Sequence, residues 1–277
     1  AFASIHIMHI IVATKQPAMT AATIAATLSQ TRGRLKDTER LADLIVATAR
    51  SQVAAIAGNV FVAFPLALAV AFSTKASTGY NLIDTKKSIS LLGELDPLGC
   101  TIFYAAIAGV WLFTSGLVSG YVDNITAYSR AGERIARHPV LLAVTGRGMT
   151  ERLGSYLDRN AGGLAGNIFF GFMLGLTPAV GQAFGLPLDI RHIAFSSANL
   201  GYLLASLDFS LQWKQTASAV AGVALIGMVN LLVSFSLALY VALRSRGISI
   251  AGISTLLPNL ARRVKEQPLR FFTPGKD

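Results

Sequence analysis

Four long stretches of this sequence contain no Asp, Glu, Lys or Arg. They are 24 to 29 residues long and cover residues 51–74, 97–122, 160–188 and 215–243. A helix needs about 20 mostly apolar residues to cross roughly 30 Å of hydrocarbon. Each stretch is therefore long enough to span a bilayer. The alternative is a set of buried helices in a large soluble core, and four charge-free runs of this length argue against it.

The composition agrees with a location in a membrane. Of the 277 residues, 53% are hydrophobic and 14% are charged, whereas a soluble protein has about 25% charged residues. A single cysteine, Cys100, excludes a disulfide framework, a CxxC redox pair and a Cys-rich zinc site. Residues 1–14 are also apolar, and we interpret them as the end of a truncated span of a longer chain. The sequence predicts an all-α polytopic membrane bundle, one domain over residues 1–277, with about five transmembrane helices.

The distribution of basic residues predicts the topology. Lys and Arg number six, three, six, two and seven in the connecting segments 15–50, 75–96, 123–159, 189–214 and 244–277. This alternation is what the positive-inside rule predicts for consecutive crossings. We therefore expect a multi-pass protein of the bacterial inner membrane, with 15–50, 123–159 and the C-terminal tail in the cytoplasm. The net charge of +10 then reflects topology more than a nucleic-acid partner.

Small and polar residues indicate how the helices associate. The spacing G-x-x-x-G, which lets helix backbones approach closely, occurs at Gly116–Gly120, Gly162–Gly166, Gly171–Gly175 and Gly181–Gly185. Three of these four pairs are in the stretch 160–188, so we expect its helix at the packed centre. Polar side chains facing lipid are costly, so five are expected inside the bundle: Gln52, Asn59, Asn167, Gln182 and Asn230. They form interhelical hydrogen bonds or line a polar transport path, and both alternatives stay open.

Arginines in the segment 123–159 suggest a contact with anions. Arg130, Arg134 and Arg137 follow one another at i, i+4 and i+7 within a helix expected in 121–137, which places three guanidinium groups on one helical face. A second helix is expected to begin at Thr150. The arginine face could bind anionic lipid headgroups or the phosphates of DNA. Beside a cytoplasmic leaflet, lipid is the favoured partner.

The run LPLDIRHIAFSSANLGYLL, residues 186–204, is the most unusual part of the chain. The 15 uncharged residues at 193–207 are too few to span comfortably, and a sixth crossing would break the charge alternation. We predict a short re-entrant or interfacial helix at 186–206. In one interpretation Asp189 pairs with Arg191, and Ser196, Ser197 and Asn199 bond neighbouring backbone groups. In the other, these five residues and His192 form a functional site.

Three common catalytic motifs are missing from the sequence. It contains no G-x-x-x-x-G-K-[ST] phosphate loop, no G-x-S-x-G nucleophile turn and no H-E-x-x-H helix. His6 and His9 lie three residues apart, but no carboxylate or cysteine is near them in the sequence. We predict no metal and no cofactor, and the catalytic residues, if there are any, are unknown.

Three runs resemble a known family: ATKQPAMTAA (13–22), SGYVDNITAYSRAGERIARHP (119–139) and, above all, residues 186–204. They are similar to the C-terminal half of a bacterial membrane-protein family catalogued as site-specific recombinase (Gcr-type), whose members have a further N-terminal region. The resemblance implies DNA recombination and a nucleic-acid partner. A tyrosine recombinase needs a nucleophilic Tyr within an Arg/His cluster, and Tyr121 and Tyr128 are the tyrosines near the arginines and His138.

Taken by themselves, the residues favour another role. They favour a transport-like or scaffold component of the membrane, whose partners are the lipid bilayer and a second copy or another membrane subunit. Recombination, as the resemblance implies, is the alternative.

Overall fold

The computed structural model of the chain describes residues 21–23, 26, 35–247, 262 and 265–266. These residues form helices and the turns that join them, with no strand among them, so the all-α prediction is confirmed. The span expected at residues 1–14, the pair His6 and His9, and most of the C-terminal tail lie outside the described residues.

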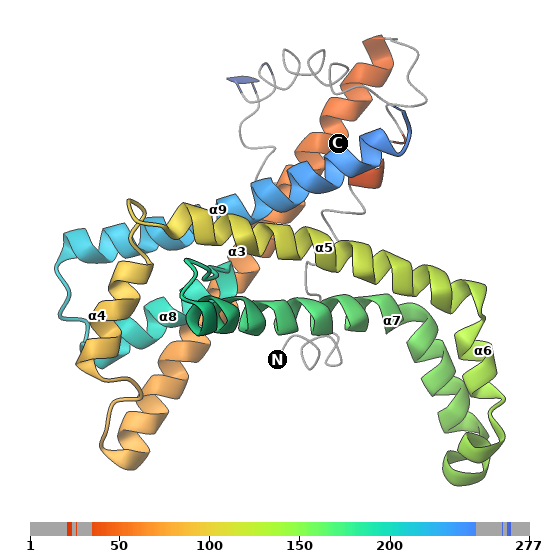
Figure 1. The fold of residues 1–277 in the computed structure, drawn as a ribbon, viewed down its shortest axis with the longest axis horizontal. Coiled ribbons are helices and arrows are strands. Elements are labelled where there is room, and N and C mark those ends of the chain that lie inside the picture. The colour runs from red at the N-terminus through yellow and green to blue at the C-terminus, as the bar shows by residue number, and fades with distance from the viewer. Residues whose placement is uncertain (1–20, 24–25, 27–34, 248–261, 263–264, 267–277) are drawn as a thin grey trace.

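The helices follow one another along the described chain with short connections (Figure 1). In order they are α3 (Leu35–Thr78), α4 (Thr85–Glu94), α5 (Thr101–Tyr128), α6 (Ala131–Ala136), α7 (Pro139–Phe184), α8 (Ile193–Ser206) and α9 (Trp213–Arg244).

Four of the described helices are long and apolar enough to cross a membrane, over Gln52–Thr78, Thr101–Tyr128, Pro139–Phe184 and Trp213–Arg244. They belong to α3, α5, α7 and α9, and they cover most of each of the four charge-free stretches. The sequence therefore predicted these helices, whereas the expected fifth span falls on residues that are not described.

Two breaks in the helices differ from the sequence prediction. The helix expected in 121–137 is divided, because α5 ends at Tyr128 and Arg130 has a left-handed backbone with φ 48°. The helix expected to begin at Thr150 is instead part of α7, which has a kink at Gly146 (φ 75°, ψ 165°) and then continues to Phe184. Only glycine adopts the backbone conformation of Gly146 without strain. Pro65 and Pro178, by contrast, lie inside helices that continue past them.

Helix α5, rather than α7, is at the centre of the long helices. It packs against both α7 and α9, whereas α7 packs mainly against α5 and α6, so the expectation that the stretch 160–188 forms the centre is wrong. A Cβ atom added at Gly162 would overlap the Ser119 carbonyl, and one at Gly166 would lie 2.9 Å from the Ser115 carbonyl oxygen. These two glycines thus allow the close contact between α5 and α7.

The other glycine spacings contribute less to helix packing. The space around Gly120, Gly175 and Gly185 is open, and Gly185 ends α7 with φ 64°. Trp111 of α5 donates a hydrogen bond from Nε1 to Thr177 Oγ1 of α7 at 2.9 Å.

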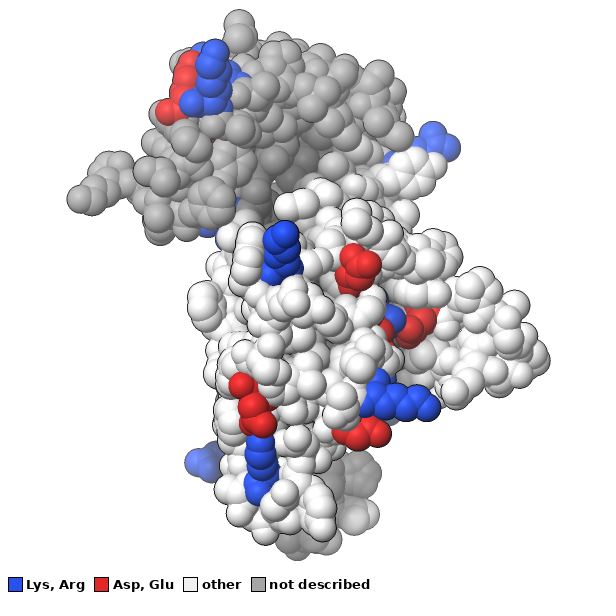
Figure 2. Space-filling model, turned by 90° about the vertical axis from the view of Figure 1, so that its left-hand side faces the viewer, with Lys and Arg blue, Asp and Glu red and all other residues white. Residues whose placement is uncertain are grey.

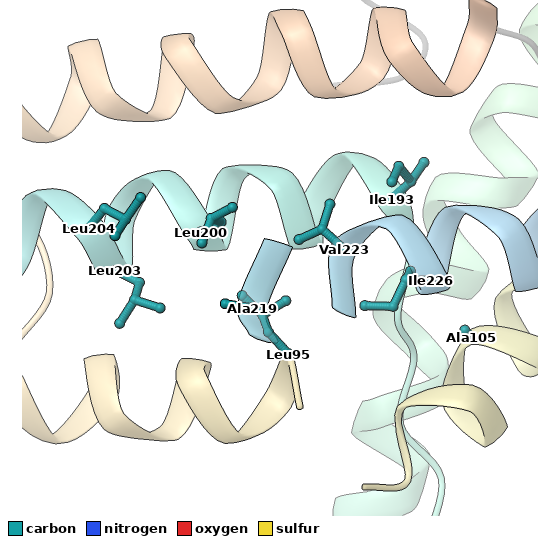
Figure 3. Packing of buried hydrophobic residues seen from close by; sticks show 9 residues of the cluster. All are labelled: Leu95, Ala105, Ile193, Leu200, Leu203, Leu204, Ala219, Val223 and Ile226. Atoms are coloured by element: carbon teal, nitrogen blue, oxygen red, sulfur yellow. The ribbon is translucent and has the colours of Figure 1, made fainter. Parts of the chain in front are cut away.

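The short helix α8 lies lengthwise along α3 and is enclosed by protein. Gly201 sits against Phe64 and Ala67 of α3, and Lys75 Nζ at the end of α3 lies 2.6 Å from Asp208 Oδ1, just beyond α8. Figure 3 shows the apolar cluster that joins α8 to its other neighbours, Leu95 at the end of α4 and the α9 face that carries Ala219, Val223 and Ile226.

Large apolar side chains cover much of the surface. In the most apolar part of α3 only 6% of the residues are buried, against 33% in the most apolar parts of α5, α7 and α9. Phe61 of α3, for example, is 77% exposed. On the face at the α4 end of the molecule the charged side chains are few and separated (Figure 2). Such an apolar surface is unfavourable in water and is typical of a protein that contacts lipid.

Candidate functional site

One buried amide joins three parts of the structure. Asn230 lies near the middle of α9 and is 2% exposed. Its Oδ1 accepts a hydrogen bond from the backbone N–H of Ile193, the first residue of α8, at 3.1 Å. Its Nδ2 donates to the carbonyl oxygens of Ala105 in α5 at 2.8 Å and of Arg191 at 2.9 Å. Asn230 thus provides a side-chain acceptor for the start of α8, whose first N–H groups have no partner within the helix.

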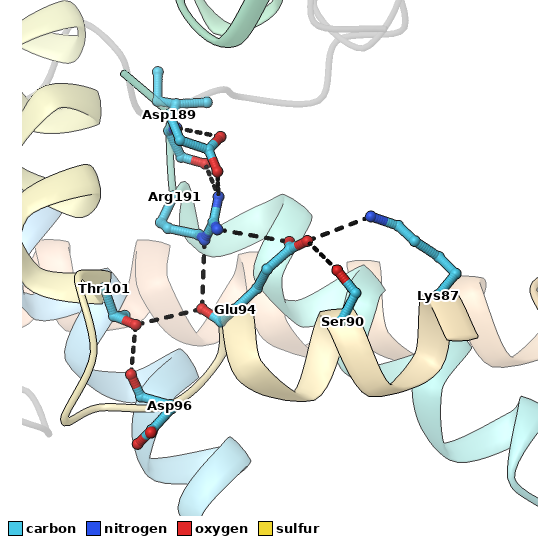
Figure 4. Close-up of polar contacts among 8 residues, drawn as sticks. Lys87, Ser90, Glu94, Asp96, Thr101, Asp189 and Arg191 are labelled. Carbon is cyan, nitrogen blue, oxygen red and sulfur yellow. Dashed lines mark hydrogen bonds and ion pairs between the residues drawn. The ribbon is translucent and has the colours of Figure 1, made fainter. Parts of the chain in front are cut away.

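Arg191 fixes the extended segment before α8 to α4 and α5 (Figure 4). Its side chain is 12% exposed, with NH1 2.6 Å from Asp189 Oδ2 and NH2 3.8 Å from Glu94 Oε2. Nε donates to the Glu94 carbonyl at 3.4 Å, and the guanidinium carbon lies 5.3 Å from the centre of the Tyr104 ring. The Arg191 backbone N–H donates to the Tyr104 carbonyl at 3.2 Å. The planar guanidinium can make these contacts together because its donors point in several fixed directions.

Glu94, the acidic partner of Arg191 in α4, makes further contacts of its own. Glu94 Oε1 lies 3.3 Å from Lys87 Nζ and accepts a bond from Ser90 Oγ at 3.4 Å. Thr101 Oγ1 donates to the Glu94 and Asp96 carbonyls. The network connects the end of α4 to the start of α5 and to residues 189–191 (Figure 4).

His192 makes the contact with α7. Its ring lies edge-on to Phe170 of α7, with ring centroids 5.1 Å apart, and 6.2 Å from the ring centroid of Phe195. His192 is buried, at 5% exposed, and its imidazole packs as an aromatic ring.

The remaining residues of the predicted motif bond within α8 or lie on its surface. Ser197 Oγ donates to the Ile193 carbonyl at 2.7 Å, and Ser196 and Ser197 are 2% and 0% exposed. Asn199 is partly buried. The pairing of Asp189 with Arg191 and the backbone bond of Ser197 are those of the first sequence interpretation.

A single short segment therefore contacts five helices. Between Asp189 and Gly201 it touches α3 through Gly201, α4 and α5 through Arg191, α7 through His192, and α9 through the Asn230 amide. Because these contacts come from several residues of the segment, its sequence fixes how the helices are arranged around it. We call residues 189–201 the junction.

Not all of the predicted intramembrane polar residues face the interior. Gln52 and Asn167 are buried, at 5% and 1% exposed, as expected. Asn59 is half-buried and donates to the Ala55 carbonyl of its own helix at 3.1 Å. The expectation is wrong for Gln182, which is exposed in the last turn of α7 and lines an open surface hollow with Pro178 and Asp189.

The three arginines expected on one helix do not share one. Arg134 lies inside the six-residue helix α6, whereas Arg130 and Arg137 cap its two ends. All three side chains are exposed. Their separation by caps follows from the left-handed turn at Arg130, and no Gly, Pro or Asn marks this position in the sequence.

Three junction partners were missed in the sequence: Glu94, Tyr104 and Phe170. Glu94 and Arg191 are 97 residues apart, and no local pattern links such distant positions. Among the described residues, no three His, Cys, Asp or Glu side chains are grouped so that they could hold a metal ion.

Comparison with known families identifies the chain. The model of a family described as site-specific recombinase matches residues 1–274. The chain belongs to this family. No curated protein and no solved structure matches it.

The family description directs attention to the tyrosines and arginines near the end of α5. Tyr128 is 94% exposed at the last position of α5, and Tyr121 is 67% exposed. The junction is different, because Ile193, Ser196 and Ser197 are at most 3% exposed. Tyr128 and the arginines are thus open to solvent, whereas the serines of the junction are not.

Proposed function

We propose that this chain is a scaffold component of the bacterial inner membrane, built around residues 186–206 as a re-entrant segment. The observation that carries the proposal is the junction, in which one segment contacts α3, α4, α5, α7 and α9. A scaffold needs such a fixed arrangement, because it must present a constant surface to its partners.

The dimensions of α8 support a re-entrant segment. Its 14 residues extend about 21 Å at 1.5 Å per residue, which is less than the roughly 30 Å of the hydrocarbon. It follows a non-helical segment and begins beside the middle of α9. Non-helical backbone at membrane depth must be bonded by protein or water, and here Asn230 and the Tyr104 carbonyl supply such bonds.

The use of the Asn230 amide favours a scaffold over a solute path. Both Nδ2 hydrogens and Oδ1 bond backbone atoms, so they are not offered to a passing solute. Asn59 bonds its own helix, and Gln182 is exposed at a helix end. These amides therefore do not form a continuous polar path through the described helices.

The charge alternation supports the orientation. The positive-inside rule assigns the arginine-rich segment around α6 and the C-terminal tail to the cytoplasm. The turn between α3 and α4 is then on the outer side. Ser77 and Ser155 are exposed and belong to the two opposite sides in this topology.

Cysteine accessibility in intact cells tests the topology. In a Cys100→Ser background, Ser77→Cys should react with a membrane-impermeant maleimide, and Ser155→Cys should react only after the cells are lysed. Equal labelling of both positions in intact cells would contradict the orientation.

The scaffold role is tested by the state of the protein in mild detergent. The full chain should be recovered together with a second copy or another membrane subunit, at a mass above its own 29.3 kDa. Asn230→Leu should lose this assembly, whereas Asn59→Leu should keep it. A chain that remains monomeric in the membrane, judged by crosslinking before extraction, would contradict the scaffold role.

DNA recombination is a second candidate, because the family description names it and because Tyr128 is exposed near arginines. It predicts salt-sensitive binding of duplex DNA and strand exchange that is lost in Tyr128→Phe. Tyr121→Phe is the matched control, since Tyr121 is also exposed on α5. Strand exchange that survives Tyr128→Phe would exclude Tyr128 as the nucleophile.

A further inference from the structure

The segment between α5 and the main part of α7 forms a distinct unit, which we call the elbow (residues 130–159). In Figure 1 the N-terminal part of α7 bends away from α5 and runs together with α6 beyond the end of α5. The two parts are firmly packed, because Gly132 N donates to Asp158 Oδ1 at 2.9 Å and a Cβ at Gly154 would overlap the Gly132 carbonyl. The elbow is therefore a fixed feature at one end of the α5–α7 pair.

The elbow is basic on its surface. It contains six arginines and three acidic residues, and the side chains of all six arginines are exposed: Arg130, Arg134, Arg137, Arg147, Arg152 and Arg159. Two of the three carboxylates already have partners, since Glu151 lies 2.9 Å from Arg147 and Asp158 accepts from Gly132. Six arginines and three carboxylates leave the elbow with a net charge of +3.

Exposed apolar side chains lie between these arginines. Val140 is 61% exposed and Val144 77%, and their i, i+4 spacing places them on the same face of the helical turns before the Gly146 kink. Met149 and Leu153, with the same spacing after the kink, are 56% and 46% exposed. Apolar side chains bordered by arginines are typical of helices that lie in the headgroup region of a membrane.

We infer that the elbow docks onto anionic lipid headgroups and inserts Val140 and Val144 below them. The inference rests on the proposed membrane location of α5 and α7, but not on the scaffold role. DNA would satisfy the arginines as well, but its charged backbone would bury the valines less completely than the hydrocarbon of a bilayer does. A bilayer satisfies both kinds of side chain at once.

The test places an environment-sensitive label at the expected insertion depth. The full chain with Cys100→Ser and Val144→Cys is labelled with a nitrobenzoxadiazole dye and reconstituted in vesicles of phosphatidylcholine, with or without about 30 mol% phosphatidylglycerol. In the anionic vesicles we expect a blue-shifted emission that is quenched by spin-labelled lipid and protected from aqueous iodide. The same label at Glu133→Cys is the control, since a carboxylate position in α6 should stay in water.

Replacing Arg130, Arg134 and Arg137 by Gln tests the headgroup contact. Each arginine removed should weaken the binding of the elbow to anionic vesicles by about fivefold. With the arginines in place, about 0.5 M salt should also weaken this binding, because it screens the charges. Because both leaflets of the vesicles have the same lipids, and iodide and salt are supplied on both sides of the membrane, the result does not depend on the orientation of the protein, nor on whether it forms an assembly.

Three results would overturn the inference. Iodide quenching of the Val144 label that is the same with and without phosphatidylglycerol would show that the elbow stays in water. A label protected from both quenchers would show that protein covers the valines. A blue shift produced by a short DNA duplex, and not by anionic lipid, would assign the elbow to nucleic acid.

Discussion

Asn230 gives the sharpest test of how the junction is held. Asn230→Leu keeps the volume of the side chain and removes hydrogen bonds to the Ile193 N–H and to the carbonyls of Arg191 and Ala105. Ala105 lies inside α5, so its carbonyl keeps its place in the helical ladder. The Ile193 N–H and the Arg191 carbonyl, however, lose a partner in a buried site.

The magnitude follows from these two groups. A buried polar group left without a partner costs about 1–3 kcal/mol, whereas hydrogen bonds between membrane helices average about 0.6 kcal/mol. We therefore expect Asn230→Leu to lower the free energy of unfolding by about 2–4 kcal/mol. Asn59→Leu removes one 3.1 Å bond within α3 and should cost less than about 1 kcal/mol.

The assay is unfolding of the full chain in bicelles by increasing amounts of a denaturing detergent, followed by tryptophan fluorescence. Trp111 reports on the α5–α7 contact through its bond to Thr177. The reasoning is refuted if Asn230→Leu and Asn59→Leu unfold at the same detergent fraction, because the amide would then contribute no more than an ordinary bond within a helix.

Three further predictions concern the packing and charge of the same helices. Gly162→Ala should destabilise the α5–α7 contact by about 1–3 kcal/mol, whereas Gly175→Ala, in open space, should be neutral or slightly stabilising; thermal unfolding of the pair in detergent measures the difference. Arg191→Lys cannot reproduce the planar contacts of the guanidinium, so proteolysis in the segment 185–192 should become faster, while Lys87→Arg should have no such effect. The His192 ring packs edge-on against Phe170 of α7, so His192→Ala should lower the free energy of unfolding by about 1–3 kcal/mol, whereas His192→Phe, which keeps a ring, should lower it less; equal unfolding of the two variants in the same detergent series would contradict it.

The long helices were predictable because their signal is local. A run of 24 or more residues without a charge requires nothing from the rest of the chain. The short helix was also predictable, since its 15 uncharged residues were too few for a span and a further crossing conflicted with the arginine pattern. The junction partners were not, because Arg191 meets Glu94 and Tyr104 only once α4, α5 and the segment before α8 have come together.

The wrong expectations share one physical cause, which is the position of a residue relative to a helix end. Gln182 is within a charge-free run, but α7 ends at Phe184, so its side chain reaches the surface. Arg130 has helical spacing to Arg134, but a left-handed turn separates it from the helix. Spacing alone predicts a shared face only if the helix continues through both residues. Gly185 and Pro187 mark the end of α7 in the sequence, whereas no Gly, Pro or Asn stands at Arg130.

The burial of the junction limits how the family description can apply to this chain. Ser196 and Ser197 are enclosed by α8 and its neighbours, and a DNA duplex about 20 Å across cannot reach them without unfolding that packing. The most distinctive run of the sequence therefore has a structural role in the arrangement described here. Any contact with DNA must come from exposed side chains, and in the described chain Tyr128 and the arginines of the elbow are the candidates. The vesicle experiment on the elbow thus also tests the recombinase function: if Val144 enters anionic lipid, the same arginines face headgroups, and strand exchange at Tyr128 would have to take place at the membrane surface.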